Sequence, residues 1–224
     1  MTDFYSHKAS PKLSSLAEQV YDHLRLAVIS SALKPGEKLV EMDIAAQMGT
    51  SQGPVREALQ RLEHDGLVER RARIGSFVSE LSYDEMYELV SVRSSIESFA
   101  IRRASTRITD EQCDELDDLV ERMAAAGTNN DIMMLAQLDM NFHRRIVELS
   151  GSTTLLRVWS SLSNPVQRFV VQSHMEKYTD FVEIGLRHRP IVEALRARDG
   201  DAAVESIQTH LMLIWQVLDR EPRE

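Results

Sequence analysis

The segment from Ser51 to Val78, which reads SQGPVREALQRLEHDGLVERRARIGSFV, constrains the fold of this chain more than any other part of the sequence. Ser51 suits the N-cap position of a helix, and Pro54 suits the first helical turn. Gly66 supplies the stop, because glycine readily takes the left-handed conformation that ends helices. Between these signals, apolar side chains recur at helical spacing and predict one buried face, made of Val55, Ala58, Leu59 and Leu62.

A basic hairpin is predicted directly after this helix. Residues 67–70 and 76–78 are short β-prone pieces, and Gly75 helps to form the turn between them. The turn and its borders carry the three arginines Arg70, Arg71 and Arg73. A helix followed by a basic hairpin can place one element in a DNA groove and the other on phosphates. The segment therefore indicates a small DNA-binding unit.

The run PVREALQRLEHDGLVERRARIGSFV resembles the winged helix-turn-helix of the GntR family of bacterial transcription regulators. The similarity extends upstream through LKPGEKLVEMDIAAQMGTS, where a short helix is expected near 41–48 and ends at Gly49. A first helix is predicted before it, capped by Ser14 or Ser15, with an apolar face made of Leu16, Val20, Leu24 and Val28. The resemblance implies a winged helix-turn-helix domain over residues 12–80, preceded by a flexible N-terminus over residues 1–11.

Charge and composition narrow the functional classes. Residues 1–80 contain ten Lys/Arg and eleven Asp/Glu, whereas residues 81–224 contain sixteen and twenty-four, so most of the net charge of −9 lies outside the DNA-binding segment. An acidic remainder repels DNA, so we expect useful affinity only when two such domains act together. No apolar run of eighteen residues is present, which argues against a membrane partner. The lack of a signal peptide and the single cysteine, Cys113, favour a cytoplasmic location.

From residue 82 the sequence changes to long helical stretches with almost no strand signals. Ser82 and Glu85 form a capping-box signature at the start of this region. Breaks are expected at Thr109 and at the glycine-containing turns that follow. We therefore predict a mainly α fold, in which the winged helix-turn-helix with its β-hairpin wing is followed by an all-α bundle over residues 81–221. Its helices, about six in number, are expected over 83–106, 110–126, 129–149, 153–176, 178–198 and 201–219.

Asp139 and His143 lie four residues apart on one predicted helix, and that spacing places both side chains on one helical face. The pair can hold a metal ion, or it can form a local hydrogen bond on a solvated face. His188 and His210 lie eleven residues before and after Asp199, at a predicted helix turn. If that turn joins antiparallel helices, the two histidines are level with each other, about 16 Å from the turn. This geometry permits a site of four residues.

A second resemblance concerns these same residues. The runs LDMNFHRRIVELSG, RHRPIVEALRARDGDAA and THL resemble the FCD ligand-binding domain of the FadR subgroup, many members of which bind a divalent metal through such a motif. The resemblance implies that the metal ligands are Asp139, His143, His188 and His210. Imidazole and carboxylate ligands suit Zn, Ni, Fe or Mn, so the residue types do not fix the metal. Four protein ligands leave one or two positions of a six-coordinate ion open to a small organic acid.

Other polar residues of the bundle are candidates for effector binding. Arg93 and Glu97 lie four apart, in a pattern that the FCD family often carries. They form a surface ion pair, or Arg93 anchors a carboxylate through its guanidinium. Gln167 and Arg168, on a later helix, are further candidates. His174 lies outside the matched motifs, and we interpret it as a surface or cavity-lining residue rather than a metal ligand.

The resemblance also implies that the helix opened by Ser51 enters the major groove of DNA. Where the family pattern S-R-x-P has arginine, this chain has Gln52, which can pair with adenine. Gly53 removes another polar contact, so we expect an operator that differs from that of typical members. The other predicted DNA contacts are Arg56, Arg61, Arg71, Arg73 and Gly75, of which Arg61 has Glu57 or Asp65 as alternative ion-pair partners.

Together these features predict a bacterial transcription factor that binds double-stranded operator DNA as a symmetric homodimer and responds to a small organic acid at a divalent metal. Effector binding is expected to change the spacing of the two DNA-binding domains, and repression is the expected output, as in most of the family. Two alternatives stay open. The same residues can activate water in a metal-dependent enzyme, or the metal site is purely structural or absent and the helical domain serves only dimerisation.

Overall fold

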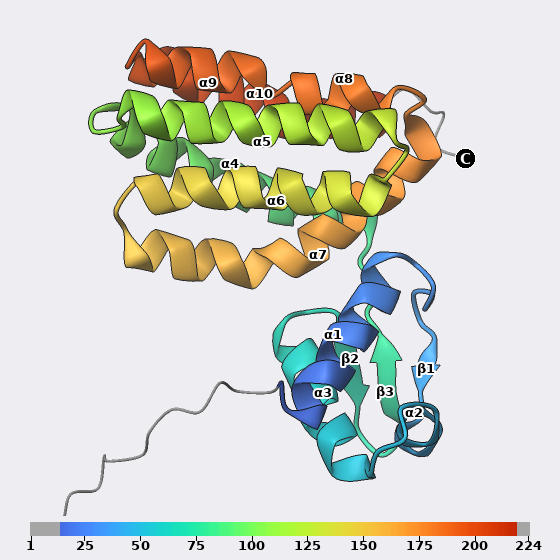
Figure 1. Ribbon diagram of the computed structural model, residues 1–224. Coiled ribbons are helices and arrows are strands. Elements are labelled where there is room, and N and C mark those ends of the chain that lie inside the picture. Colours follow the sequence, from blue (N-terminus) through green and yellow to red (C-terminus); the bar gives the residue numbers. More distant parts are fainter. Residues whose placement is uncertain (1–13, 219–224) are drawn as a thin grey trace, which may run out of the picture.

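The computed structural model describes residues 14–218, which form a small N-terminal domain below a larger helical domain (Figure 1). The expected flexible N-terminus, residues 1–11, lies outside the described residues, and so do positions 219–221. The N-terminal domain consists of α1 (Leu16–Ile29), β1 (Lys38–Leu39), α2 (Glu41–Gln47), α3 (Gln52–His64), β2 (Val68–Arg71) and β3 (Gly75–Val78). The predicted mainly α fold with a winged helix-turn-helix at its start is confirmed.

The basic hairpin belongs to a three-stranded antiparallel sheet of order β1-β3-β2. Across the hairpin, Val68 pairs with Val78 and Arg71 pairs with Gly75. The strand β1, in which Lys38 pairs with Phe77, was not predicted, because two residues are too few to show an alternating pattern. The predicted apolar face of α3 is fully buried against α1 and the sheet, whereas Leu16 is exposed because it is the first residue of α1.

Serine residues were predicted to cap both α1 and α3, but only the serine before α1 makes a capping hydrogen bond in the described residues. Ser15, not Ser14, caps α1, because its hydroxyl accepts a hydrogen bond from the backbone N–H of Glu18 at 3.1 Å. Ser51 occupies the N-cap position of α3, but its side chain makes no capping hydrogen bond within the described residues. The residue three positions on is Pro54, which has no N–H to donate to a cap. Ser51 therefore leaves its hydroxyl exposed at the start of the helix.

The second domain is built entirely of helices within the described residues. Its first helix begins as expected, because Ser82 and Glu85 form the predicted capping box. The break predicted at Gly127-Thr128 lies slightly early, since both residues still belong to the helix, which ends at Thr128. Glycine is needed at position 127 because a Cβ there would lie 2.5 Å from the backbone of Phe181. The helices are α4 (Tyr83–Ser105), α5 (Asp110–Thr128), α6 (Ile132–Leu149), α7 (Thr153–Lys177), α8 (Phe181–Leu186), α9 (Arg189–Arg196) and α10 (Gly200–Leu218).

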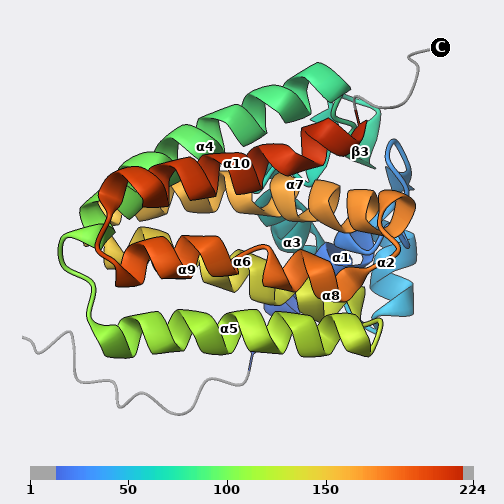
Figure 2. The same ribbon diagram turned by 90° about the horizontal axis from the view of Figure 1, so that it is seen from above.

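The helix predicted over 178–198 is two helices rather than one. Helices α8 and α9 lie end to end and are separated at Arg187 and His188 (Figures 1 and 2). The signal that sequence analysis overlooked is Pro190, which sits in the first turn of α9, where proline is well tolerated. As a result His188 occupies the N-cap position of α9, at an interruption of the helix rather than in its middle.

The helices of this domain pack around one large apolar cluster, with two smaller clusters beside it. Figure 2 shows α10 beside α4, and α5 on the opposite side from them, with α6 and α9 between. The largest buried side chains of this core include Phe142 and Ile146 of α6, together with Leu195 of α9 and Ile207 of α10. None of the helices in residues 14–218 combines the length and the apolar character that a membrane span requires.

Candidate metal centre and DNA-binding surface

The four residues predicted as metal ligands lie together in the core of the helical domain. Asp139 and His143 come from successive turns of α6, His188 from the start of α9, and His210 from α10. One ligand atom from each can be chosen so that all four lie within 4.8 Å of one another. The rings of His188 and His210 have their centroids 4.1 Å apart, which agrees with the predicted level position across the turn.

Hydrogen bonds at the rear of two imidazoles orient their front nitrogens toward one point. The Nδ1 of His143 lies 2.6 Å from a carboxylate oxygen of Glu97, and the Nδ1 of His188 lies 3.0 Å from the carbonyl of Gly185. Both oxygens only accept hydrogen bonds, so each Nδ1 must donate. In the neutral rings, the Nε2 atoms therefore present lone pairs. This is the arrangement by which outer hydrogen bonds fix the tautomer of a metal-binding histidine.

At short range, the lone pair of His188 faces an acceptor, and that of His143 faces His210, whose tautomer is not set by any hydrogen bond of its Nδ1 among the described residues. The Nε2 of His188 lies 3.1 Å from Asp139 Oδ1, and the Nε2 of His143 lies 3.3 Å from the Nε2 of His210. Acceptors that face each other repel unless a proton or a cation lies between them. The donor chemistry therefore fits a divalent cation held by three imidazoles and one carboxylate, as for Zn, Ni, Fe or Mn.

Burial favours the neutral form of two histidines of this cluster. It lowers the pKa of His143 despite the opposing attraction of Glu97, and it lowers the pKa of His210 well below its usual value. Burial alone would raise the pKa of Asp139, but the attraction of His143 and the close contact with His188 oppose it and lower that pKa instead. These shifts favour neutral imidazoles at His143 and His210 and an ionised carboxylate at Asp139, the protonation states that bind metals.

Glu97 is not on the cavity wall but behind the metal cluster, and it is completely buried. Its carboxylate also accepts hydrogen bonds at 2.6 Å from Arg93 Nε and from Trp159 Nε1. Burial alone would raise its pKa, but the charges of Arg93 and His143 lower it to about 2. The alternative of a surface ion pair for Arg93 and Glu97 is therefore wrong, since both side chains are buried. Their i,i+4 spacing signalled a pair without indicating its burial.

A cavity of about 60 Å³ opens beside the metal cluster. Arg93 and His174 line it together with three of the metal-ligand residues. Apolar side chains of α4, α7, α8 and α10, together with Tyr178 and Arg187, complete the wall. His174 is 6% exposed, so the prediction of a surface or cavity-lining residue is resolved in favour of the cavity. The Nη2 atom of Arg93 is buried without a hydrogen-bond partner among the described residues, which leaves a charged donor facing this space.

Gln167 and Arg168 do not line this cavity, contrary to expectation. They contact the N-terminal domain, because Gln167 accepts a hydrogen bond from Arg25 of α1 at 2.6 Å, and Arg168 donates to the carbonyl of Ser79 at 2.7 Å. Sequence analysis placed both on the correct helix but could not show which face of α7 meets the cavity. Arg25, which was not predicted, also donates to Asn164 at 2.9 Å.

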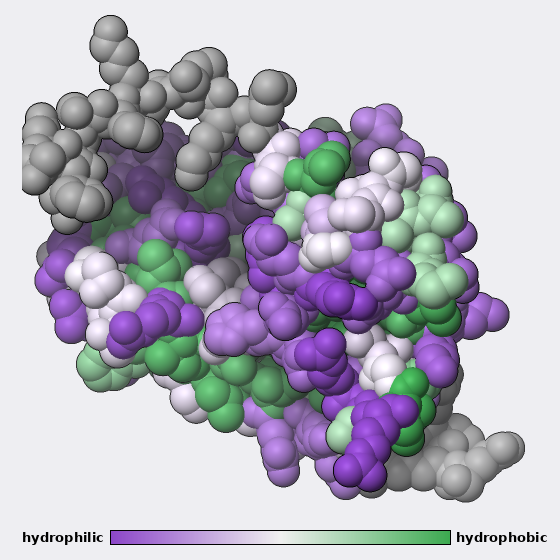
Figure 3. Space-filling view, turned by 90° about the horizontal axis from the view of Figure 1, so that it is seen from below, coloured by the Kyte–Doolittle hydropathy of each residue, from purple (hydrophilic) through white to green (hydrophobic). Residues whose placement is uncertain are grey.

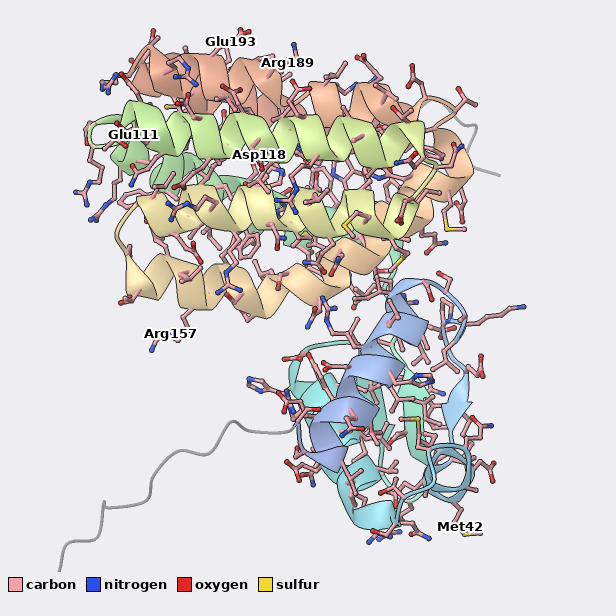
Figure 4. All side chains as sticks on the ribbon, in the orientation of Figure 1. Met42, Glu111, Asp118, Arg157, Arg189 and Glu193 are labelled. Carbon is pink, nitrogen blue, oxygen red and sulfur yellow. The ribbon has the colours of Figure 1, made fainter. Side chains whose placement is uncertain are left out.

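The predicted DNA-contacting residues lie on one exposed end of the N-terminal domain. Figure 1 shows that the start of α3 and the turn between β2 and β3 both point away from the helical domain, and Met42 of α2 lies at the same end (Figure 4). Seen from below, this side of the molecule is largely hydrophilic, with separate hydrophobic patches (Figure 3). Ser51, Gly53, Arg56, Arg61, Arg71 and Arg73 are exposed, and Gln52 and Gly75 are partly exposed.

Several of these arginines are held in place by neighbours. Arg56 donates to Glu41 at 2.6 Å and to Gln52 at 2.8 Å, so α2 and the start of α3 are tied together. Arg61 lies over the ring of Tyr21 at 4.1 Å, rather than in an ion pair with Glu57 or Asp65 among the described contacts. In the wing, Arg71 stacks on Phe77 and pairs with Glu69, while Arg73 occupies the turn with a positive φ of 65°. Arg73 is therefore an exposed cation in the turn of the wing.

The comparisons with known proteins agree with both parts of the chain. Residues 16–78 match the family described as bacterial regulatory proteins, gntR family, and residues 88–212 match the FCD domain. The probable D-xylose utilization operon transcriptional repressor of Paenarthrobacter nicotinovorans is 32% identical over 198 residues, which cover 88% of this chain and 86% of that protein. The HTH-type transcriptional repressor RspR of Escherichia coli strain K12 is 29% identical over 198 residues, with the same coverage.

Solved structures show the same architecture. A putative GntR transcriptional regulator from Rhodococcus sp. RHA1 superposes with a TM-score of 0.76 at 25% identity, covering 92% of this chain and 99% of that chain. Escherichia coli McbR/YncC gives a TM-score of 0.74 at 24% identity, covering 91% and 99%, which supports the fold. The matching families and relatives are transcriptional regulators rather than enzymes. The chain therefore belongs to the GntR family of bacterial regulatory proteins and carries an FCD domain behind its winged helix-turn-helix.

Proposed function

We propose that this protein is a cytoplasmic transcriptional repressor that binds double-stranded operator DNA as a homodimer and is controlled by a small carboxylate metabolite. The metabolite binds at a divalent metal held by Asp139, His143, His188 and His210. The convergence of these four residues beside a cavity with an unpaired arginine donor carries the proposal. Repression is supported by the relatives, since two that align over 88% of this chain are named as repressors.

The residues around the cavity have distinct tasks in binding such an acid. A bound divalent metal supplies positive charge and open positions for carboxylate oxygens. Arg93 offers its Nη2 donor to the same carboxylate while its Nε remains bonded to Glu97. The apolar wall, which includes Val166, Phe169 and Val170, excludes water and strengthens these charged contacts.

Helix α7 offers a direct physical link from this cavity to the DNA-binding domain. Val166, Val170 and His174 on one face of the helix line the cavity. The adjacent face holds the N-terminal domain through Asn164, Gln167 and Arg168, and through Val171, which packs in the core of that domain. Two ligand states of the cavity that shift α7 would therefore move the winged helix as well.

Close packing near the middle of α7 makes the link stiff. Pro165 interrupts the hydrogen bonding of α7, and its ring lies against Gly66 at the end of α3, since a Cβ at Gly66 would lie 3.1 Å from it. Gly66 has a positive φ of 73°, which glycine adopts at little cost. The end of α3 thus lies directly against α7, the helix that lines the cavity. Because this contact is closely packed, a displacement of α7 would be passed on to the end of α3.

Binding to DNA from the region upstream of the coding sequence tests the proposed activity. We expect sequence-dependent binding that weakens steeply as salt increases, because phosphate contacts release counterions. Replacing Arg73 by alanine should weaken binding to all sequences alike and reduce the salt slope by about 1. Fluorescence anisotropy measures both quantities. Arg157→Ala, on the outer surface of α7 (Figure 4), is the matched control and should leave both unchanged.

Equally weak binding of the wild-type protein to every DNA fragment at low salt would contradict the proposed DNA-binding activity. A metal that proves necessary for folding, with no change in DNA affinity on acid binding, would instead favour the structural role of the site. These two outcomes are distinguishable, since the first concerns the winged helix and the second the helical domain.

Removing the Arg25 side chain is expected to uncouple the two domains. In Arg25→Ala the hydrogen bonds to Asn164 and Gln167 are lost, while the metal cluster and the cavity wall stay intact. We expect the acid-dependent change in DNA affinity to shrink by about 5-fold, equivalent to about 1 kcal/mol of coupling. Anisotropy titrations with and without a metal-bound acid measure this ratio, and calorimetry should show unchanged acid binding. An undiminished ratio would show that coupling runs elsewhere.

A further inference from the structure

A second buried nitrogen besides that of Arg93 faces the cavity without a partner. His174 of α7 lies on the cavity wall and is 6% exposed, and its Nδ1 has no hydrogen-bond partner in the described part of the chain. The same holds for Nδ1 of His210, but that ring belongs to the metal cluster. His174 is not a member of the cluster, so metal binding does not explain it.

Leaving such a nitrogen unpaired is costly. A buried polar group without a hydrogen bond costs about 1–3 kcal/mol, and nearly all such groups in proteins have a partner. The ring of His174 meets the edge of Tyr178, and the wall around it combines apolar side chains with Arg93 and Arg187, none of which bonds to its Nδ1 among the described residues. Leucine or phenylalanine at this position would avoid the cost. A histidine here is therefore explained by a ligand atom that pairs with it.

The charge state of His174 limits what that atom can be. Burial lowers its pKa to about 4, with Asp139 opposing the shift and His188 adding to it, so the ring is neutral at pH 7. A neutral imidazole has one nitrogen that donates and one that accepts. A second carboxylate would pair only with the tautomer that carries its proton on Nδ1, whereas a hydroxyl group both donates and accepts and suits either tautomer.

The cavity size limits the length of the ligand. A volume of about 60 Å³ compares with the 300–1,000 Å³ that is usual for drug-sized ligands. The carboxylate of the ligand is already assigned to the metal and Arg93. The ligand group that contacts His174 must therefore lie within a few bonds of that carboxylate. Long alkyl chains and sugars exceed this space.

Resting on the proposed function, we propose that His174 is a specificity-determining residue, which selects a short hydroxycarboxylate over the corresponding unsubstituted acid by hydrogen bonding to the hydroxyl group. The carboxylate binds at the metal and Arg93, and the hydroxyl oxygen binds Nδ1 of His174. No covalent step is involved. The residue acts on ligand choice alone and leaves metal binding unchanged.

Matched acid pairs test this assignment. Glycolate and acetate differ by one hydroxyl, and so do lactate and propionate. Calorimetric titration of zinc-loaded full-length protein should show a preference for the hydroxy acid of about 10-fold or more, because a site built to pair with a hydroxyl rejects the analogue that lacks it. In His174→Leu the preference should fall to about 2-fold or less, with zinc content unchanged. His64→Leu, at an exposed position of α3, is the matched control.

A second variant and a spectroscopic measurement keep the test decisive if His174→Leu does not fold. His174→Asn retains a polar atom close to the position of Nδ1 and should retain the preference. In wild-type protein, the ¹⁵N resonance of Nδ1 of His174 should shift on addition of lactate but not of propionate. A preference that survives in His174→Leu, or equal binding of each pair to wild-type protein, overturns the assignment. If none of the four acids binds, the proposed carboxylate effector itself is contradicted.

Discussion

Replacing His210 by alanine is expected to lower the affinity of the protein for a divalent metal by at least about 100-fold. Substitution of groups that only orient metal ligands already costs about 10–100-fold, and His210 would be a direct ligand. It is the least buried member of the cluster, so its removal disturbs the core less than removal of His143 or His188. Of the four positions it therefore gives the clearest separation between metal binding and folding.

The measurement is metal content after purification and competitive titration with a chelator. In wild-type protein, saturating metal should also raise the free energy of unfolding by about 4 kcal/mol at a thousand times the dissociation constant. That stabilisation should be almost absent in His210→Ala at the same metal concentration. His64→Ala, at an exposed position of α3, controls for loss of a histidine as such. Equal metal content in the two variants would contradict the assignment of the site.

Changing Glu97 to glutamine is expected to destabilise the fold by about 3–5 kcal/mol. Arg93 is 3% exposed, and Glu97 is the partner that neutralises it in the core. Removing one charge of a buried pair leaves the other uncompensated, which is the source of this large cost. Urea unfolding measures the difference. Glu148→Gln breaks the comparable contact with Arg144 on the surface of α6, and should cost less than about 1 kcal/mol.

The same substitution should also weaken metal binding by about 10–100-fold. Arg93 and Trp159 both donate to one oxygen of Glu97, so the amide oxygen of glutamine is expected to stay there and its NH₂ group to face His143 Nδ1. The NH₂ group cannot accept a proton from Nδ1, so the ring is driven to the tautomer that carries its proton on Nε2. The nitrogen that faces the cluster then has no lone pair for a metal. Unchanged metal affinity in a folded Glu97→Gln protein would show that Glu97 does not control the tautomer.

Acid should reduce the stability difference between wild type and Glu97→Gln. The pKa of Glu97 is lowered from 4.5 to about 2 in the folded protein, so its contribution is complete above pH 4.5 and is lost as the pH falls through 2. The difference in unfolding free energy between the two proteins should therefore be constant near neutrality and narrow in this acidic range. A difference that widens on acidification would contradict the assigned direction of the shift.

The local elements were largely predictable because their signals are local. The capping box at Ser82 and the spacing of Asp139 and His143 depend only on neighbours along one helix. The errors arose where a distant segment decides the outcome. Gly127 was placed in a helix break, but it still belongs to α5 and is a point of close approach to Phe181. The strand β1 exists because Lys38 and Leu39 pair with β3.

By itself, the sequence indicated the type of each domain through hydrophobic periodicity, which is a property of the chain, and the four candidate metal ligands through the resemblance of their motifs to the FCD domain. Tertiary structure decided which polar residues serve the site. It turned Gln167 and Arg168 toward the DNA-binding domain, placed Glu97 behind His143, and brought His174 into the cavity. The physical reason is that neighbouring residues of a helix differ by about 100° in direction, so only the packing of the helix decides which of them meets a ligand.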